Sequence, residues 1–461
     1  MGTFEKNLAE GNVFQRLITF AVPFLIANIV QSLYSIADML IVGNFSGTIS
    51  MAGVNLGSQI TLIETNIIVG FCTGGAVLIA QYIGAQKQED MKRTTSTLIT
   101  VLLYLAIILT VLMIFLGDPF LRLLQTPEEA FSEASGYLFV TVLGTIFIFG
   151  YNALSAILRG MGDSKRPLIF VGIACVVNVG LDLLLCGPFG MGAVGAAIAT
   201  VISQAISMIL CIVYLKKKGF VFDFKPSSFR IDRPSLRMIV KIGLPSAVQS
   251  GITNISFLII TALVNTLGGV TASAAVGVVG KFNAFAIMPT VAMASSISTV
   301  AAQNIGAKQW GRAKQTCRLG AAIAFVISLL IFALVQLFPE AVLRLFDDDP
   351  EMIANGVEYM RSFSIDYLLT PALFCYNGLF IASGHTNFSL LNNALSAVIL
   401  RAPMAVILGT TLGMGLTGVG LAVPIASFGS LLLVIWFYLT KRWTVNVVDK
   451  ASPPAAALEK E

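Results

Sequence analysis

Charged residues are scarce in this chain. Only 11% of its 461 residues are Asp, Glu, Lys or Arg, whereas about a quarter of a soluble domain is charged. Hydrophobic residues make up 56% of the chain, and the mean hydropathy is +0.86. These values exclude a soluble globular protein. They predict an all-α polytopic membrane protein, because helices satisfy their own backbone hydrogen bonds in lipid.

Catalytic and metal-binding residue types are also rare. The chain has one histidine, His385, and six cysteines without metal-type spacing. No GxxxxGK[ST] nucleotide-binding motif is present. The glycine-rich "GMGAVGAA" begins an apolar span, which favours close helix packing over phosphate binding. An integral-membrane enzyme is therefore the less favoured alternative. We expect no cofactor, and an ion gradient as the only energy source.

Twelve apolar runs are long enough to cross a bilayer, which takes about 20 residues at 1.5 Å each. They lie at roughly 13–42, 52–78, 95–116, 134–158, 167–187, 193–215, 236–265, 273–300, 317–338, 355–380, 388–409 and 416–440.

Positive charge alternates between the connecting segments. The N-terminus, every second loop and the C-terminus hold 24 of the 29 Lys and Arg residues. This asymmetry predicts that both termini of this multi-pass protein face the cytoplasm, across a plasma or inner membrane. The same alternation argues against a nucleic-acid-binding patch. We expect membrane lipid as a partner, no obligate protein partner, and a monomer.

The chain contains a tandem repeat. "AQYIGA" at 80–85 recurs as "AQNIGA" at 302–307, and the same offset superposes Pro23 on Pro245. Each repeat has six spans, so the two bundles have the same orientation and are related by a pseudo-two-fold axis along the membrane normal. A substrate path between two such lobes predicts transport by alternating access. A duplication without transport is the alternative.

The predicted boundaries follow from this repeat. They are an N-lobe at 1–215, a basic cytoplasmic linker at 216–235, a C-lobe at 236–443 and a polar tail at 444–461.

Few charges lie within the predicted spans. Each would cost at least ~2.5–3.5 kcal/mol at the bilayer centre, so we expect it to face protein or water. These residues are Asp38, Glu64, Asp182, Lys281, Asp366 and Arg401. For Lys281 and Asp366, a position near the end of a span is an equal alternative.

Polar residues of the N-lobe are expected to gather in one layer. Asp38 lies about 7 Å below the outer end of its span, Asp182 lies at a similar depth, and Thr200 lies about 10 Å inside. Asn178 shares a helical face with Asp182, and Gln31 shares one with Asp38. Two such carboxylates do not easily both ionise in a low-dielectric site. The pair can hold a proton, or bind Na⁺ with amide and hydroxyl oxygens completing the shell.

The C-lobe lacks this set. The repeat places apolar residues opposite the polar ones and Arg401 opposite Asn178. The apolar partners of Asp38, Asp182, Glu64 and Thr200 are Ile260, Ala405, Ala286 and Val423. The asymmetry indicates a cation site built into one half. Pro23, which removes a helical hydrogen bond, and its counterpart Pro245 are candidate hinges.

Glu64 lies near mid-membrane, where its carboxylate can attract an organic cation; a hydrogen-bonded packing residue is the alternative. Lys281 and Arg401 are unusual in a cation pump. They either neutralise Asp366 or Glu64, or they indicate anionic or zwitterionic substrates.

Several segments resemble the multidrug and toxic compound extrusion (MATE) family. They are "VPFLIANIVQSLYSIADMLIVGNFSG", the repeated "AQ-x-IGA", "ILRGMGDSKRP" and "NVGLDLLLCGPFGMGAVGAAIATVIS". The resemblance covers about Gly11 to Trp443. It implies twelve helices in two bundles and the efflux of drug-like cationic or amphipathic compounds in exchange for H⁺ or Na⁺. A lipid-linked saccharide flippase of the wider superfamily is the rival.

The resemblance also assigns residues. The family's N-lobe cation site falls on Asp38, Asn178, Asp182 and Thr200, and Gln31 and Asn152 resemble residues that line the same cavity. The NorM-like branch has a glutamate in its seventh helix, where this chain has no acid, and Asp366 is the nearest match to that branch's aspartate in the tenth helix. The DinF-like branch is the better match.

Overall fold

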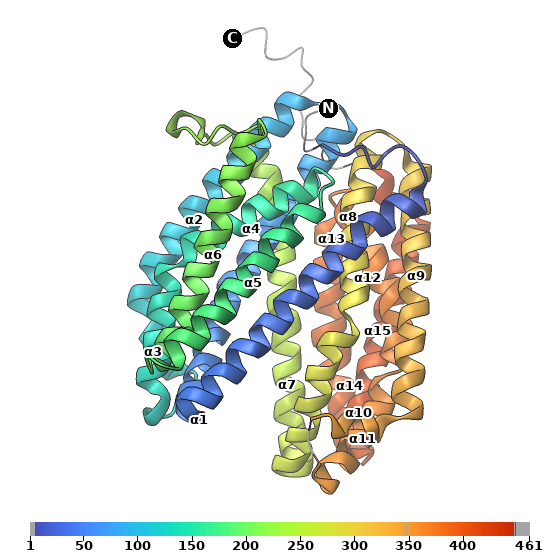
Figure 1. Cartoon of the computed structure of the whole chain (residues 1–461). Coiled ribbons are helices and arrows are strands. Elements are labelled where there is room, and N and C mark those ends of the chain that lie inside the picture. The colour runs from blue at the N-terminus through green and yellow to red at the C-terminus, as the bar shows by residue number, and fades with distance from the viewer. Residues whose placement is uncertain (1–4, 347, 447, 449–461) are drawn as a thin grey trace. The chain divides into compact units, whose positions relative to one another are not determined.

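A computed structural model describes residues 5–346, 348–446 and 448, and these residues form helices and no strands (Figure 1). The all-α prediction is confirmed. Most of the predicted tail at 444–461 lies outside the described residues.

The helices of the first half are α1 (Val13–Gly84), α2 (Gln88–Leu123), α3 (Glu128–Leu143), α4 (Thr145–Gly160), α5 (Lys165–Cys186), α6 (Gly192–Lys217) and the 3₁₀ turn η1 (Pro226–Ser228). The second half contains α7 (Arg233–Ala286), α8 (Met288–Gly306), α9 (Trp310–Leu337), α10 (Pro339–Arg344), α11 (Pro350–Phe363), α12 (Asp366–Ala382), α13 (Thr386–Ala394), the π-helix η2 (Leu395–Arg401), α14 (Ala402–Val406), the π-helix η3 (Ile407–Thr411), α15 (Gly415–Leu439) and the 3₁₀ turn η4 (Arg442–Thr444).

These helices provide the twelve predicted spans. Eight helical stretches are long and apolar enough to cross a membrane, and two bent pairs, α3 with α4 and α11 with α12, each form one more. Two of the eight stretches, α1 and α7, each contain two spans, because the helix is interrupted at Gly47 in α1 and at Gly269 in α7. The second part of α7 continues into α8 after a single residue.

The backbone repeats the same turns in both halves. Gly47 has φ of 83°, and Gly269, at the repeat-related position, has φ of 65°. Gly162 and Gly384 are related by the same offset and have φ of 87° and 85°. The bends also correspond, at 52° between α3 and α4 and 48° between α11 and α12. Positive φ favours glycine, so the two halves match where a side chain would strain the turn.

The chain forms two compact units. Of the described residues, the first contains those up to Leu8 together with Val22–Ala247, and the second contains Ala9–Ala21 together with those from Val248 onward. α1 therefore passes from the second unit to the first just before Pro23, and α7 passes from the first to the second just after Pro245. Both prolines are buried within continuous helix.

The basic segment 216–235 belongs wholly to the first unit. Ser96 Oγ of α2 donates to the Ser228 carbonyl at 2.6 Å, and Asp232 N donates to Thr97 Oγ1 at 3.0 Å. These bonds hold the segment against α2, so the boundary between the units falls within α7 rather than in the segment itself.

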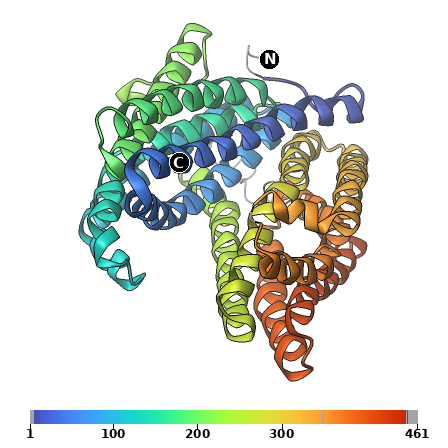
Figure 2. The same cartoon turned by 60° about the horizontal axis from the view of Figure 1, so that its bottom comes forward.

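Each unit has its own packed interior. In the first, α5 packs along α6, and α6 contacts α3 and α4. In the second, α8, α9, α12 and α15 pack together, and Figure 2 shows these yellow-to-red helices gathered in one bundle. The six cysteines are free thiols, and five of them are buried, as expected for small hydrophobic residues.

Candidate functional site

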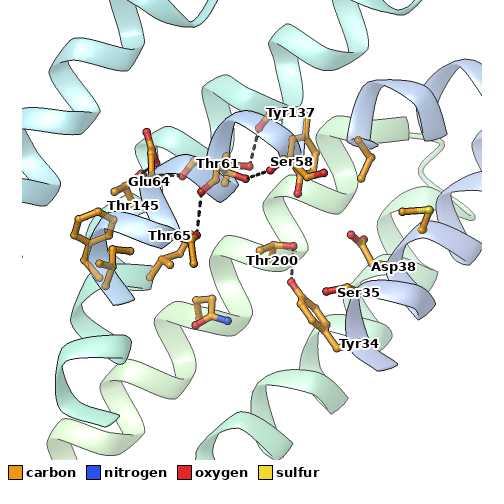
Figure 3. Close-up of a pocket in the computed structure, with 17 residues that line it drawn as sticks. Tyr34, Ser35, Asp38, Ser58, Thr61, Glu64, Thr65, Tyr137, Thr145 and Thr200 are labelled. Atoms are coloured by element: carbon orange, nitrogen blue, oxygen red, sulfur yellow. Dashed lines mark hydrogen bonds between the residues drawn. The ribbon is translucent and has the colours of Figure 1, made fainter. Parts of the chain in front are cut away.

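The first unit contains a polar cavity of about 260 Å³ between α1, α3, α4 and α6. Figure 3 shows Glu64 and Asp38 on opposite sides of it, with Thr61 and Thr200 between them. Its polar lining includes Tyr34, Asp38, Thr61, Glu64, Thr145 and Thr200. The cavity thus brings two of the predicted carboxylates and the predicted threonine together.

Asp38 of α1 and Asp182 of α5 form a buried pair. Asp38 is 7% exposed and Asp182 is fully buried. Their carboxyl groups lie close enough to interact directly. Asp38 Oδ1 and both oxygens of Asp182 accept no hydrogen bond from the described residues. A proton shared by the two carboxyl groups would give these oxygens a partner and remove the repulsion between them.

Asn178 lies one helical turn before Asp182 and is also fully buried. Its amide nitrogen and amide oxygen both lack a hydrogen-bond partner among the described residues. Buried polar groups are rarely left unpaired, because each costs about 1–3 kcal/mol. The layer formed by Asp38, Asn178 and Asp182 is therefore incomplete by itself, and a proton, a Na⁺ ion or water would complete it.

Thr200 of α6 lies on the same cavity. Its Oγ1 is 3.0 Å from the Tyr34 hydroxyl, and Tyr34 lies one turn before Asp38 on α1. This bond links α6 to α1 beside the carboxylate. It holds the Thr200 hydroxyl, which can contribute an oxygen ligand to a bound cation.

Glu64 lines the opposite part of the cavity and is 6% exposed. Thr145 Oγ1, at the first residue of α4, lies 3.3 Å from Glu64 Oε2. The other oxygen, Oε1, is buried without a hydrogen-bond partner among the described residues. The described lining of the cavity contains no lysine or arginine. Glu64 is therefore a hydrogen-bonded interior carboxyl group that faces open space.

The second unit is apolar at the positions that the repeat relates to Asp38, Glu64, Asp182 and Thr200. Ile260, Ala286, Ala405 and Val423 all belong to one apolar core cluster and are between 0% and 7% exposed. The sequence comparison between the halves thus predicted the positions at which polar residues of the first unit correspond to buried apolar residues of the second.

The charges of the second unit are arranged differently. Asp366 is buried and interacts with the Ser427 hydroxyl and with Arg401. The Arg401 guanidinium lies over the Phe257 ring, 5.3 Å from its centroid, and ends the π-helix η2. Arg401 and Lys281 are absent from the ion pairs of the described residues, and Lys281 is exposed. The suggestion that Lys281 neutralises a buried acid stays a prediction.

Gln31 and Asn152 do not line the cavity. Gln31 is exposed on α1, and Asn152 is half-buried, with its amide nitrogen donating to the Ile148 carbonyl at 2.8 Å. The resemblance suggested that both line the cavity, and the helical spacing from Asp38 also placed Gln31 in the polar layer. The structure instead leaves Gln31 on an exposed side of α1.

Sequence reasoning did not identify several hydroxyl groups of the cavity. Ser58, Thr61 and Thr65 precede or follow Glu64 along α1, and Thr61 Oγ1 donates to the Ser58 carbonyl at 3.0 Å. Their spacing of three and four residues within an apolar span was a signal that could have found them. Tyr137 and Thr145 come from other helices and gave no such signal.

The described residues contain no group of three or more His, Cys, Asp or Glu side chains that could hold a metal ion. The polar layer instead offers two carboxylates with amide and hydroxyl oxygens, which suit a proton or Na⁺ rather than a transition metal.

The MatE family model matches the chain twice, over residues 23–184 and 245–407. One match begins at Pro23 and the other at Pro245, the pair that the tandem repeat superposes. The probable multidrug resistance protein YpnP of Bacillus subtilis is 29% identical over 437 residues, covering 95% of this chain and 97% of the relative. The probable multidrug resistance protein NorM of Thermotoga maritima is 25% identical over 442 residues, covering 94% of each.

Solved structures give the same fold. An outward-facing multidrug resistance MATE family transporter of the MOP superfamily has a TM-score of 0.90 at 23% identity, covering 98% of this chain and all of that one. A MOP superfamily transporter from Pyrococcus furiosus has a TM-score of 0.89 at 24% identity, covering 97% and 99%. Relatives named NorM are among the matches, so the DinF-like branch stays a prediction. The doubled match, the twelve spans and the shared fold together make this chain a member of the MatE family, a multi-pass membrane transporter rather than an enzyme.

Proposed function

We propose that this chain is a secondary active antiporter that exports drug-like cationic or amphipathic compounds in exchange for H⁺ or Na⁺. The names of the relatives support multidrug export, because YpnP, NorM and the multidrug export protein MepA of Staphylococcus haemolyticus all carry such names. We further propose a plasma-membrane location, cytoplasmic termini and a monomer.

One observation supports the coupling site above the others. In the first unit Asp38 and Asp182 are buried with unpaired oxygens, whereas their repeat-related positions in the second unit are the packed apolar residues Ile260 and Ala405. The shared scaffold does not need carboxylates at these two positions, since the second unit packs Ile260 and Ala405 there. Their cost is understandable if the layer binds and releases a cation during each cycle.

The prolines suggest how the cation is coupled to movement. Each lies next to the point where its helix passes from one compact unit to the other. A proline lacks one helical hydrogen bond, so the helix can bend there at low cost. Pro23 is on the same helix as Asp38, so a change of charge at Asp38 can favour one shape of α1 over another.

A lipid-linked saccharide flippase is the second candidate. Its phosphate-bearing substrate would favour lysine or arginine in the cavity, and neither is among the described residues that line the cavity of the first unit. The acidic lining fits a cationic substrate better.

The test is transport by the purified chain in lipid vesicles. A fluorescent organic cation is followed while a pH gradient and a Na⁺ gradient are imposed separately. At least one gradient should drive accumulation of the cation against its own gradient. If neither gradient does so, the chain is not an antiporter for this class of substrate.

A further inference from the structure

We propose that Glu64 is a second proton-carrying site in the cavity, separate from the Asp38–Asp182 pair, so that each cycle can exchange two monovalent cations for one substrate. This inference rests on the antiport proposed above. It assigns to Glu64 a proton that leaves when a positively charged substrate enters.

The Thr145 hydroxyl has two acceptors within reach and one hydrogen to donate. Its hydroxyl oxygen lies 3.3 Å from Glu64 Oε2 and 3.5 Å from the Thr141 carbonyl oxygen, but a threonine hydroxyl has only one hydrogen to donate. If Glu64 is ionised, it can only accept, and one of the two acceptors is left without a donor. If Glu64 is protonated, it donates to Thr145, and Thr145 donates to Thr141. The protonated form satisfies both contacts.

Among the described residues that line the cavity, no cationic side chain compensates the charge of Glu64. Glu64 is only 6% exposed, and its Oε1 has no hydrogen-bond partner in the described part of the chain. A buried carboxylate without a cationic partner is strongly unfavourable. A proton is therefore the expected companion of Glu64 while the cavity holds no cation.

The other titratable groups around the cavity lie on the side of Asp38 or are tyrosines. α1 contributes Tyr34 and Asp38, α3 contributes Tyr137, and the described lining residues from α4 and α6 are uncharged. Asp182 of α5 interacts with Asp38. Glu64 and Asp38 lie on opposite sides of the cavity in Figure 3, and Glu64 has its own hydrogen-bond partner in Thr145. The two acidic sites can thus gain and lose cations separately.

Glu64 also contacts the bend of a neighbouring span. Thr145 is the first residue of α4, directly after the 52° bend at Gly144. Gly144 packs closely on α6, where an added Cβ would lie 2.2 Å from Val201 Cγ2. Binding or release of a proton at Glu64 alters a hydrogen bond at this bend. The protonation state of Glu64 can therefore affect how α4 packs against α6.

The test measures how much charge moves in each cycle. The full-length chain is reconstituted in vesicles with a monovalent organic cation such as ethidium. A potassium diffusion potential is applied without a gradient of H⁺ or Na⁺, and the H⁺ or Na⁺ gradient that drives the wild type is applied without a potential. Two cations exchanged for one positive charge move one net charge across the membrane in each cycle, so the potential alone should drive transport by the wild type. Glu64→Gln should lose this response while the ion gradient still drives transport.

Glu129→Gln is the matched control, because Glu129 is an exposed glutamate at the start of α3 in the same unit. It should keep the wild-type response to the potential. If Glu64→Gln also keeps that response, the proposal is overturned. If no gradient drives even the wild type, the antiport itself fails, and a second measurement decides the role of Glu64.

That second measurement is infrared difference spectroscopy of the reconstituted protein between acid and alkaline buffer. The stretching band of a protonated carboxyl group should lose intensity in Glu64→Gln and not in Glu129→Gln. An unchanged band in Glu64→Gln would show that Glu64 does not bind a proton, whatever the transport results.

Discussion

Asp38 on α1 and Asp182 on α5 have carboxyl groups close enough to interact, with no cationic side chain paired to either among the ion pairs of the described residues. In water such a pair would separate. Here α1 and α5 keep the two carboxyl groups close together. This arrangement suits a pair whose charge changes during the transport cycle.

Asp38→Asn and Asp182→Asn should each abolish gradient-driven transport, because the remaining carboxyl group cannot hold and release a cation as the pair does. Each variant should fold, since an asparagine relieves the repulsion between two buried acids. Transport in vesicles and monodispersity on size exclusion measure the two effects. Asp118→Asn, an exposed acid in the same unit, should transport like the wild type. Full activity in both cavity variants would remove the pair from the mechanism.

Tyr34→Phe should weaken binding of the coupling cation without changing the fold. The variant removes one hydroxyl that bonds Thr200 Oγ1 at 3.0 Å. A hydrogen bond of this kind contributes about 1 kcal/mol, which is roughly a fivefold change in affinity. The measurement is the H⁺ or Na⁺ concentration at half-maximal transport. Tyr104→Phe, an exposed tyrosine on α2, is the control, and an equal shift in both variants would count against the role of Tyr34.

Ile260→Asp should prevent stable folding, although it copies the acid of the first unit into the second. Ile260 is 1% exposed within an apolar cluster, and that cluster offers no polar partner comparable to Asn178 among its described members. The milder Ile260→Val should cost only about 0.5–1.5 kcal/mol. Thermal unfolding of the purified variants measures both. A well-folded Ile260→Asp protein would mean that the two units are less different than their packing indicates.

Asp163→Asn should destabilise the first unit by about 1–3 kcal/mol. Asp163 is fully buried in the turn between α4 and α5, where it pairs with Lys6 Nζ at 3.1 Å and with the Arg166 guanidinium. Its Oδ1 also accepts from Lys165 N at 3.2 Å. Thermal unfolding again gives the result, with Asp118→Asn as the control. Equal melting temperatures would show that the ion pairs contribute nothing.

Acid should loosen the segment around Asp223. Hydrogen bonds from the Ser228 hydroxyl and from Lys225 N lower the pKa of Asp223 below its ordinary value of 3.8. Because the folded pKa is the lower one, the bonds stabilise the turn above the unfolded pKa, and this stabilisation is lost as the pH falls through the folded value. Hydrogen exchange over 223–228 should be slower in the wild type than in Asp223→Asn at neutral pH, and the difference should vanish in acid. A difference that persists in acid would contradict this.

The sequence predicted the features that depend on a local run of residues or on a repeated pattern. Apolar runs predicted the twelve spans, and the offset that superposes Pro23 on Pro245 predicted two repeated halves. Asp38 and Asp182 were found because a buried charge is conspicuous in an apolar run. The pairing of Thr145 with Glu64, and of Tyr34 with Thr200, could not be predicted in the same way, because each joins two helices whose rotation about their axes depends on packing. The same reason explains why Gln31 and Asn152 were placed in a cavity that they do not line.

The exchange at the aspartate pair is tested most directly by counting ions released when substrate binds. The purified protein is mixed with a saturating organic cation in weakly buffered solution, with one indicator for protons and one for Na⁺. The account predicts that the wild type releases H⁺ or Na⁺ as the substrate binds, and that a variant carrying both Asp38→Asn and Asp182→Asn binds substrate with a smaller release. Substrate binding by the wild type without release of either ion, or equal release by the double variant, would contradict it.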